Sequence, residues 1–255
     1  MLKILICILA GLGAGLGTGF AGMSAAAVIS PMLIAFLDMD PYMAVGIALA
    51  SDVLASAVSA VTYGRNKNLD VRNGLVMMAA VLCFTAVGSF VASIVPKTTM
   101  GNFSVIMTLL LGIKFIVKPV VAPKPCLTDA TTAQKIIRSL LGGALVGFIC
   151  GFVGAGGGMM MLLVLTSLLG YELKTAVGTS VFIMSVTALT GAVSHFAIGG
   201  LPDITALIVC VVSTLVFAQV AALFANRAQP RTLNRVTGAV LVMLGAAILI
   251  VNFCK

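Results

Sequence analysis

The chain alternates long apolar runs with short polar connections. In its first half, the runs at residues 42–63, 74–95 and about 101–117 are long enough to cross a membrane as helices. A helix of about 20 residues, at 1.5 Å per residue, spans the ~30 Å hydrocarbon core. Two shorter apolar pieces, residues 3–20 and 24–37, precede these runs. The pattern therefore predicts an all-α integral membrane protein.

Clusters of glycine interrupt the apolar pattern at two places. The stronger cluster, GFVGAGGG, occupies residues 151–158, and a weaker copy, GFAGMSAA, lies 132 residues earlier at residues 19–26. Each glycine costs a helix about 1 kcal/mol relative to alanine, and broken backbone in lipid is tolerated only beside protein or a water-filled cavity. Paired breaks are typical of transporter binding sites. The alternative is that the glycines only allow helices to pack closely.

The second half of the chain repeats the first. Ala-Val-Gly at residues 44–46 recurs at residues 176–178, with the same 132-residue shift that relates the glycine clusters. We therefore predict two transmembrane repeats, residues 1–121 and 135–255, joined by a linker at residues 122–134. Each repeat is expected to contain a pair of short helices separated by a glycine break, followed by three transmembrane helices.

Charge indicates how the helices are oriented. Only 9% of the residues are charged, and the net charge of +8 comes from cations in short loops, so orientation in the membrane explains it better than nucleic-acid binding does. The basic loop positions are Arg65, Lys67, Arg72, Lys118, Lys124, Lys135, Arg138, Lys174, Arg227, Arg231 and Arg235. If these positions face the cytoplasm, the linker is cytoplasmic and Asp38, Asp40 and Asp203 lie outside. Matching loops of the two halves then carry opposite charge, which predicts inverted repeats with both termini outside.

Several of these motifs resemble a known family. Residues 11–31, 44–46 and 151–158, together with Ala-Val-Gly-Thr-Ser at residues 176–180, resemble the paired signatures of the sulfite exporter TauE/SafE family. The resemblance covers essentially the whole chain, and the first half departs from it at residues 23–26, where a fuller glycine run is typical. It implies transport of a small sulfur-containing anion, such as sulfite, sulfoacetate or another organosulfonate, across the bacterial cytoplasmic membrane.

The glycine breaks are the predicted site of anion binding. A helix that begins inside the membrane has up to four amides without intrahelical partners, and its dipole adds partial positive charge there. Helices that start near Met23 and Ala155 would direct two such ends at the bilayer midplane. The candidate substrate-binding residues are Gly19, Gly22, Met23, Ser24, Gly154, Gly156, Gly157, Gly158, Thr179 and Ser180.

A polar stripe is predicted on the helix that follows the first break. Asp52, Ser56, Ser59 and Tyr63 share one helical face, and His195 ends a similar stripe in the second half. We interpret these five residues as candidates for coupling or gating. A carboxylate at mid-helix costs at least ~2.5 kcal/mol in the membrane, and it would repel an anion, so we expect Asp52 to bind a proton when the anion binds. The alternatives are that Asp52 caps a neighbouring helix, and that Tyr63 and His195 are interface anchors.

Two other functions have weaker support in the sequence. An anion channel could use the same helix ends. An intramembrane enzyme would need a nucleophile and a base, but Ser180 and His195 would lie ~22 Å apart on one helix, so no enzymatic activity is expected. The six cysteines lack CxxC spacing and the single histidine lacks a second histidine at metal-site spacing, so neither a metal nor another cofactor is expected. The oligomeric state does not follow from the sequence.

Overall fold

The computed structural model describes residues 1–92, 109, 113, 116–117, 132–153, 157–199 and 202–253. The elements formed by these residues are all helices, with no strand among them. The prediction of an all-α protein is therefore confirmed for the described part of the chain. The span expected at about residues 101–117 and most of the expected linker lie outside the described residues.

Four helices of the first half follow the apolar runs. They are α1 (Leu2–Ala21), α2 (Ala26–Leu37), α3 (Pro41–Arg65) and α4 (Val71–Ala92). The start of α3 is set by two local features. Pro41 begins the helix, where its missing N–H is not needed, and the Asp40 carboxylate accepts a hydrogen bond from the Met43 amide at 3.1 Å.

Five described helices form the second half. They are α6 (Thr132–Val153), α7 (Gly157–Ser167), α8 (Leu173–Gly199), α9 (Ile204–Arg227) and α10 (Pro230–Phe253). The expectation of two short helices at each break needs correction. α2 and α7 are short, with 12 and 11 residues, but α1 and α6 have 20 and 22 residues. Their glycines lie against neighbouring helices, and this packing compensates for the low helix propensity.

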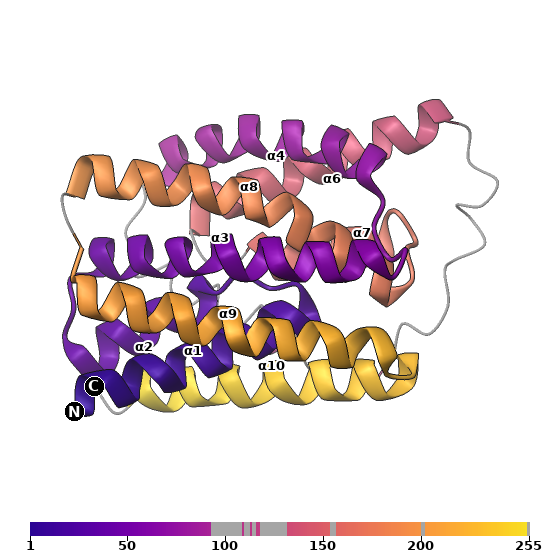
Figure 1. The fold of residues 1–255 in the computed structure, drawn as a ribbon. Helices are drawn as coiled ribbons and strands as arrows, with labels where there is room; N and C mark the ends of the chain where they lie inside the picture. The colour runs from indigo at the N-terminus through magenta and orange to yellow at the C-terminus, as the bar shows by residue number, and fades with distance from the viewer. Residues whose placement is uncertain are drawn as a thin grey trace.

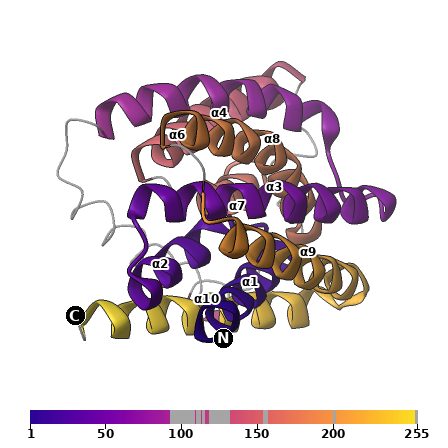
Figure 2. The same cartoon turned by 60° about the vertical axis from the view of Figure 1, so that its left-hand side comes forward.

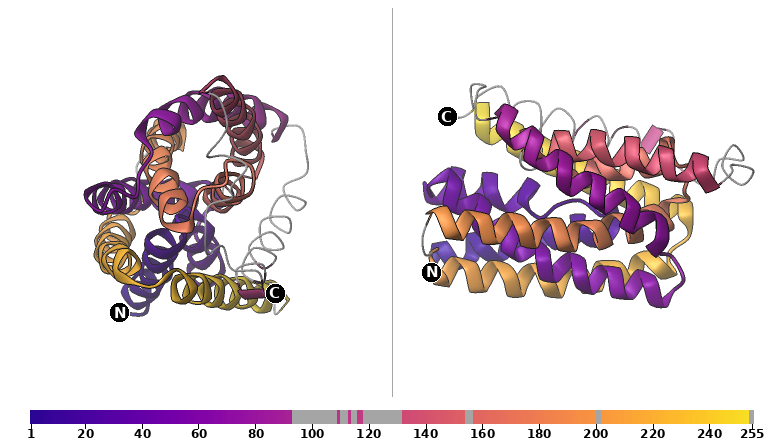
Figure 3. Two further views of the ribbon diagram at one scale, coloured as in Figure 1. Left: turned by 90° about the vertical axis from the view of Figure 1, so that its right-hand side faces the viewer. Right: turned by 90° about the horizontal axis from the view of Figure 1, so that it is seen from above.

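The helices run roughly along one direction, and the two broken pairs enter the bundle from opposite ends (Figures 1 and 3). α1 and α2 form a hairpin that opens at the end where the chain begins, whereas α6 and α7 open at the other end. α10 runs along the outer edge beside α1 (Figures 1 and 2). Helices Leu2–Ala21, Met43–Arg65, Leu173–Ala197 and Ile204–Arg227 are long and apolar enough to cross a membrane.

Two glycine-lined seams join helices from different halves of the chain. α1 packs along α9, and a Cβ atom added at Gly15 would lie 2.7 Å from the Thr214 carbonyl oxygen. α6 packs along α4, and a Cβ added at Gly147 would lie 2.5 Å from the Val81 carbonyl oxygen. Figure 3 shows these pairs on opposite sides of the bundle, with α3 between them. The first helix of each half is therefore held by the other half.

The two ends of the bundle have different polar contacts. At the end where α3 and α9 finish, the Tyr171 hydroxyl donates to Asp70 at 2.5 Å and the Lys174 ammonium donates to the Asn226 carbonyl at 2.8 Å. Burial, and then the Asp70 carboxylate, raise the pKa of Tyr171 above its ordinary value. These contacts join the α3–α4, α7–α8 and α9–α10 connections, and most of the described basic residues lie in or beside these three connections.

The opposite end contains the acidic turns. There the Lys3 ammonium pairs with the Asp203 carboxylate, which also caps α9 by accepting from the Ala206 amide at 3.0 Å. The hydrogen bond from Lys3, and then that from Ala206, hold the pKa of Asp203 below its ordinary value. A surface cleft of about 350 Å³ lies beside this pair, lined by Lys3, Leu37, Met39, Asp40, Met43 and Asp203.

The α1–α9 seam predicts a strong effect of a small substitution. Gly15→Ala would place a methyl group 2.7 Å from one backbone oxygen and 2.8 Å from the Ala218 amide nitrogen. Such overpacking typically costs about 1–3 kcal/mol, so we expect a lower thermal unfolding midpoint for the protein purified in detergent. Gly64→Ala is the matched control, because its methyl group would meet only a Leu69 methyl at 3.4 Å. Equal midpoints for the two variants would contradict the close seam.

Candidate functional site

The first glycine break is a short turn between α1 and α2. Gly22 has a positive φ of 59°, which glycine adopts without strain, and its amide donates to the Thr18 carbonyl at 2.9 Å. The Thr18 hydroxyl in turn donates to the Met23 carbonyl at 3.0 Å. α2 then begins at Ala26, whose amide donates to the Ser24 hydroxyl at 3.2 Å. The break predicted at residues 19–26 therefore consists of residues 22–25.

The start of α7 lies directly against this turn. A Cβ atom added at Gly158 would be 2.6 Å from the Ser24 amide nitrogen and 2.7 Å from the Gly22 carbonyl oxygen. Ser180 of α8 donates to the same carbonyl at 2.8 Å. Two broken segments from different halves thus meet in the interior of the bundle. Gly157 is the first residue of α7, whereas Gly154 and Gly156 lie outside the described residues.

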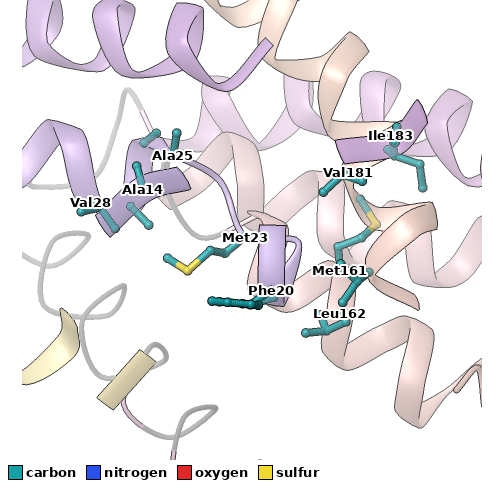
Figure 4. Packing of buried hydrophobic residues seen from close by; sticks show 14 of the residues in the cluster. Ala14, Phe20, Met23, Ala25, Val28, Met161, Leu162, Val181 and Ile183 are labelled. Atoms are coloured by element: carbon teal, nitrogen blue, oxygen red, sulfur yellow. The ribbon is translucent and has the colours of Figure 1, made fainter. Parts of the chain in front are cut away.

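The surroundings of this contact are apolar. In Figure 4, Met23 and Ala25 of the first break lie in the same buried cluster as Met161 of α7 and Val181 of α8. The Met23 side chain folds back onto α1, where its sulfur would lie 2.4 Å from a Cβ added at Gly17. Polar groups at the break are therefore shielded from water, and hydrogen bonds and charges there act in a medium of low dielectric constant.

Asp52 reaches the start of α2 from the middle of α3. Its carboxylate is fully buried and accepts hydrogen bonds from the Ser24 hydroxyl at 2.7 Å and from the Ser56 hydroxyl at 2.8 Å. Ser24 also accepts from the Ala26 amide at 3.2 Å, so the carboxylate is linked through one hydroxyl to the amide end of α2. A negative charge is stabilised at this end of a helix.

The remaining members of the α3 stripe are also buried. Tyr63 is fully buried and donates its hydroxyl to the Gly19 carbonyl at 2.9 Å, so it contacts the last turn of α1 and is not an interface anchor. The Ser59 hydroxyl is buried and has no hydrogen-bond partner among the described residues. Gly19 itself faces α9, where an added Cβ would lie 2.4 Å from the Ala221 methyl group; this glycine therefore has a clear packing role.

Two predicted residues lie away from the break. The Thr179 hydroxyl accepts a hydrogen bond from the Asp70 amide at 3.2 Å, so it contacts the α3–α4 connection. His195 lies near the C-terminal end of α8, with Nδ1 2.9 Å from the Gly191 carbonyl oxygen. Thr179 and Ser180 were both predicted to lie near the anion. In the structure Ser180 lies at the break, whereas Thr179 contacts the α3–α4 connection.

Met184 belongs to the second-half stripe that ends at His195, and the structure makes it a neighbour of the break although it was not among the candidate site residues. Its sulfur would lie 2.7 Å from a Cβ added at Gly158, and the Ser180 hydroxyl lies 3.9 Å from the same sulfur. The 132-residue shift could have identified it, because this shift relates Asp52 to Met184. The two halves therefore present different side chains at equivalent positions.

Known proteins resemble the chain over almost its full length. The family described as "Sulfite exporter TauE/SafE" matches residues 7–248. The probable membrane transporter protein YunE of Bacillus subtilis (strain 168) is 25% identical over 268 residues, covering 97% of this chain and 98% of that protein. YdhB of the same organism, also named a probable membrane transporter protein, is 24% identical and covers 89% and 90%.

A third relative comes from an archaeon. A probable membrane transporter protein of Methanocaldococcus jannaschii is 24% identical over 204 residues, covering 76% of this chain and 73% of that protein. All three relatives are named as transporters, and this class of protein is not enzymatic. Together with the apolar helices, the match over residues 7–248 shows that the chain is an integral membrane protein belonging to the sulfite exporter TauE/SafE family of transporters.

Proposed function

We propose that the protein is a secondary carrier or facilitator that moves a small sulfur-containing anion, such as sulfite, sulfoacetate or another organosulfonate, across the cytoplasmic membrane. One observation carries this proposal. The starts of α2 and α7 meet inside the bundle, where Gly158 lies against the Gly22 carbonyl oxygen and the Ser24 amide nitrogen. In this proposal Gly22, Met23, Ser24, Gly157, Gly158 and Ser180 line the anion site. The sequence also assigns Gly154 and Gly156 to the site, and these two lie outside the described residues.

Helix ends suit an anion that has to be released. Each helix start carries the equivalent of roughly +0.5 charge, and its amides donate hydrogen bonds to oxygen atoms of the ligand. The basic residues whose side chains the structure describes lie at or near helix ends: Lys3, Arg65, Lys67, Arg72, Arg138, Lys174, Arg227, Arg231 and Arg235. An arginine clamp would hold a sulfonate with paired charge-assisted bonds, whereas amides and hydroxyls hold it more weakly.

The proposed architecture is a pair of inverted repeats with a cytoplasmic linker and both termini outside. Three observations support it: the 132-residue shift, the hairpins α1–α2 and α6–α7 that open at opposite ends (Figure 1), and the seams α1–α9 and α4–α6, which the shift relates to each other. Reporter fusions at Lys67 and Lys255 test the orientation. We expect a cytoplasmic signal at Lys67 and an external signal at Lys255, and the reverse result would overturn the proposed orientation.

The transport assay uses purified protein in liposomes. Uptake is measured for sulfite, thiosulfate, sulfoacetate, isethionate, taurine and sulfate, with protein-free liposomes as the control. We expect saturable uptake and counterflow of at least one sulfur-containing anion. Uptake that rises without saturation and lacks counterflow would favour the alternative of an anion channel, whose ligand could use the same helix ends. No uptake of any anion would contradict the proposed function.

Proton coupling at Asp52 is part of the same proposal. An ionised carboxylate beside the anion would repel it, and the buried site offers little screening. Protonation of Asp52 on anion binding removes this repulsion. The hydrogen bonds from Ser24 and Ser56 support a second role that was considered from the sequence, in which Asp52 stabilises the amide end of α2. The two roles are compatible, because the carboxylate can stabilise α2 when the anion site is empty.

A further inference from the structure

The two helix starts differ in the side chain that lies against each. At α2, the buried Asp52 carboxylate is linked through Ser24 to the Ala26 amide, with distances of 2.7 and 3.2 Å. At α7, the equivalent neighbour is the Met184 thioether, packed against Gly158. The shift of 132 residues relates Asp52 to Met184 and Ala26 to Gly158. One helix start therefore has an internal carboxylate, and the other has a neutral side chain.

The charges at the break can be counted. Each break holds the start of one helix, with about +0.5 charge, and the end of another, with about −0.5 charge, so the helix ends roughly cancel. An ionised Asp52 then gives the empty site one negative charge, and a protonated Asp52 with one bound monovalent anion gives the same total. Other ionisable side chains do not change the count, because those on the helices packed against α3 lie near helix ends or in the α1–α9 seam. They are Lys3, Cys7, Lys174, His195, Cys210 and Arg227.

We propose that the Asp52 carboxylate is the internal anion of the empty site and that the substrate replaces its charge, so that each monovalent sulfur anion binds together with one proton and is carried in an electroneutral, one-to-one symport. This inference rests on the proposed function and adds the charge of the substrate and the stoichiometry. The proton comes from water on the side of entry and bonds to a carboxylate oxygen of Asp52. It leaves to water on the other side when the anion leaves.

The same surroundings disfavour a metal cation at Asp52. The Ser24 and Ser56 hydroxyls both point their hydrogens at the carboxylate, and the amide end of α2 adds partial positive charge. A sodium ion would have to turn both hydroxyls away and lie against this end of the helix. A proton adds to a carboxylate oxygen with only a hydroxyl rotation. The buried Ser59 hydroxyl, which lacks a partner among the described residues, continues the polar stripe beyond Ser56.

The experiment measures isethionate accumulation in liposomes with an imposed pH gradient and an independently set membrane potential. For the wild type, we expect about tenfold accumulation per unit of pH difference and no response to potential. Asp52→Asn carries the anion without its proton, so accumulation becomes insensitive to the pH gradient. Accumulation by this variant instead responds to the membrane potential. It changes up to about 50-fold for 100 mV, which corresponds to the ~2.3 kcal/mol that one charge gains across that potential.

A reciprocal variant tests whether a carboxylate at the start of α7 can replace the carboxylate of Asp52. Met184→Asp adds a second carboxylate at the start of α7, so anion binding requires two protons and the proton dependence of uptake rises from first to second order. The double variant Asp52→Asn, Met184→Asp again has one carboxylate and should regain first-order dependence and electroneutral transport. Asp203→Asn, at the external end of α9, is the control and should behave as the wild type.

The outcomes separate a failure of the proposed proton symport from a failure of the proposed anion transport. Potential-driven uptake by the wild type, accumulation driven by a sodium gradient, or proton coupling retained in Asp52→Asn would overturn the inference while leaving anion transport intact. No uptake of any tested anion by the wild type would instead overturn the proposed function. If Asp52→Asn does not reach the membrane in folded form, the response of the wild type to pH gradient and potential decides alone.

Discussion

Gly158→Ala is expected to lower transport strongly while leaving the protein in the membrane. The added methyl group would lie 2.6 Å from the Ser24 amide nitrogen, 2.7 Å from the Gly22 carbonyl oxygen and 2.7 Å from the Met184 sulfur. Only the methionine can move cheaply, so the starts of α2 and α7 have to separate. Overpacking of this kind costs about 1–3 kcal/mol. If this cost falls on the paired helix starts that bind the anion, affinity decreases by roughly 5- to 150-fold.

The measurement is initial uptake of the best substrate at a concentration below half-saturation. Surface expression and the thermal unfolding midpoint of the same samples separate a damaged site from a damaged fold. Gly64→Ala, whose methyl group would meet only Leu69 at 3.4 Å, should keep wild-type uptake. Wild-type uptake by Gly158→Ala would show that the two helix starts can part without loss, and the anion site would then lie elsewhere.

The helices themselves could be predicted well from the apolar pattern. Residues 42–63 were expected to form a helix, and α3 extends from Pro41 to Arg65. Residues 74–95 were expected to form another, and α4 extends from Val71 to Ala92. Prediction worked here because each helix is bounded by polar residues and prolines that an apolar span excludes. Asp40 and Pro41, for example, mark the start of α3 in the sequence as well as in the structure.

The pairing of helices could not be predicted. α1 packs on α9 and α6 on α4, so each half holds the first helix of the other. Gly15 and Gly147 make these contacts, but a glycine edge indicates only that some helix comes close and does not identify the partner. The glycine clusters also serve two purposes that their spacing does not separate, since Gly19 packs against α9 and Gly22 forms the turn.

In the candidate site, too, helical spacing predicted which residues share a face, but not which neighbouring helix they contact. Asp52, Ser56, Ser59 and Tyr63 were placed on one face by helical spacing, and all four are buried. Spacing did not distinguish Thr179 from Ser180, because adjacent residues point about 100° apart on a helix. Which of them faces the break depends on how α8 is rotated, and that rotation is set by contacts with distant residues: Asp70 for Thr179 and Gly22 for Ser180.

Asp52→Asn is expected to flatten the pH dependence of transport. Since the anion binds with a proton on Asp52, wild-type uptake without an imposed gradient should fall as the pH rises and the carboxyl group loses its proton. Asparagine has nearly the same size and stays neutral at every pH. Its carbonyl oxygen can accept from one of the serine hydroxyls, and the other hydroxyl can rotate to accept from its amide, so packing at the start of α2 is retained.

The profile is measured as initial uptake at equal internal and external pH, so that no proton gradient drives transport. Asp203→Asn makes the same chemical change at a carboxylate outside the spanning helices, and it should follow the wild-type profile. A flat profile for Asp52→Asn beside a sloping one for Asp203→Asn assigns the titration to the buried group. If Asp52→Asn keeps the wild-type slope, the carboxylate serves only to hold the amide end of α2 through Ser24, and the proton on the anion's path has to be carried by another group.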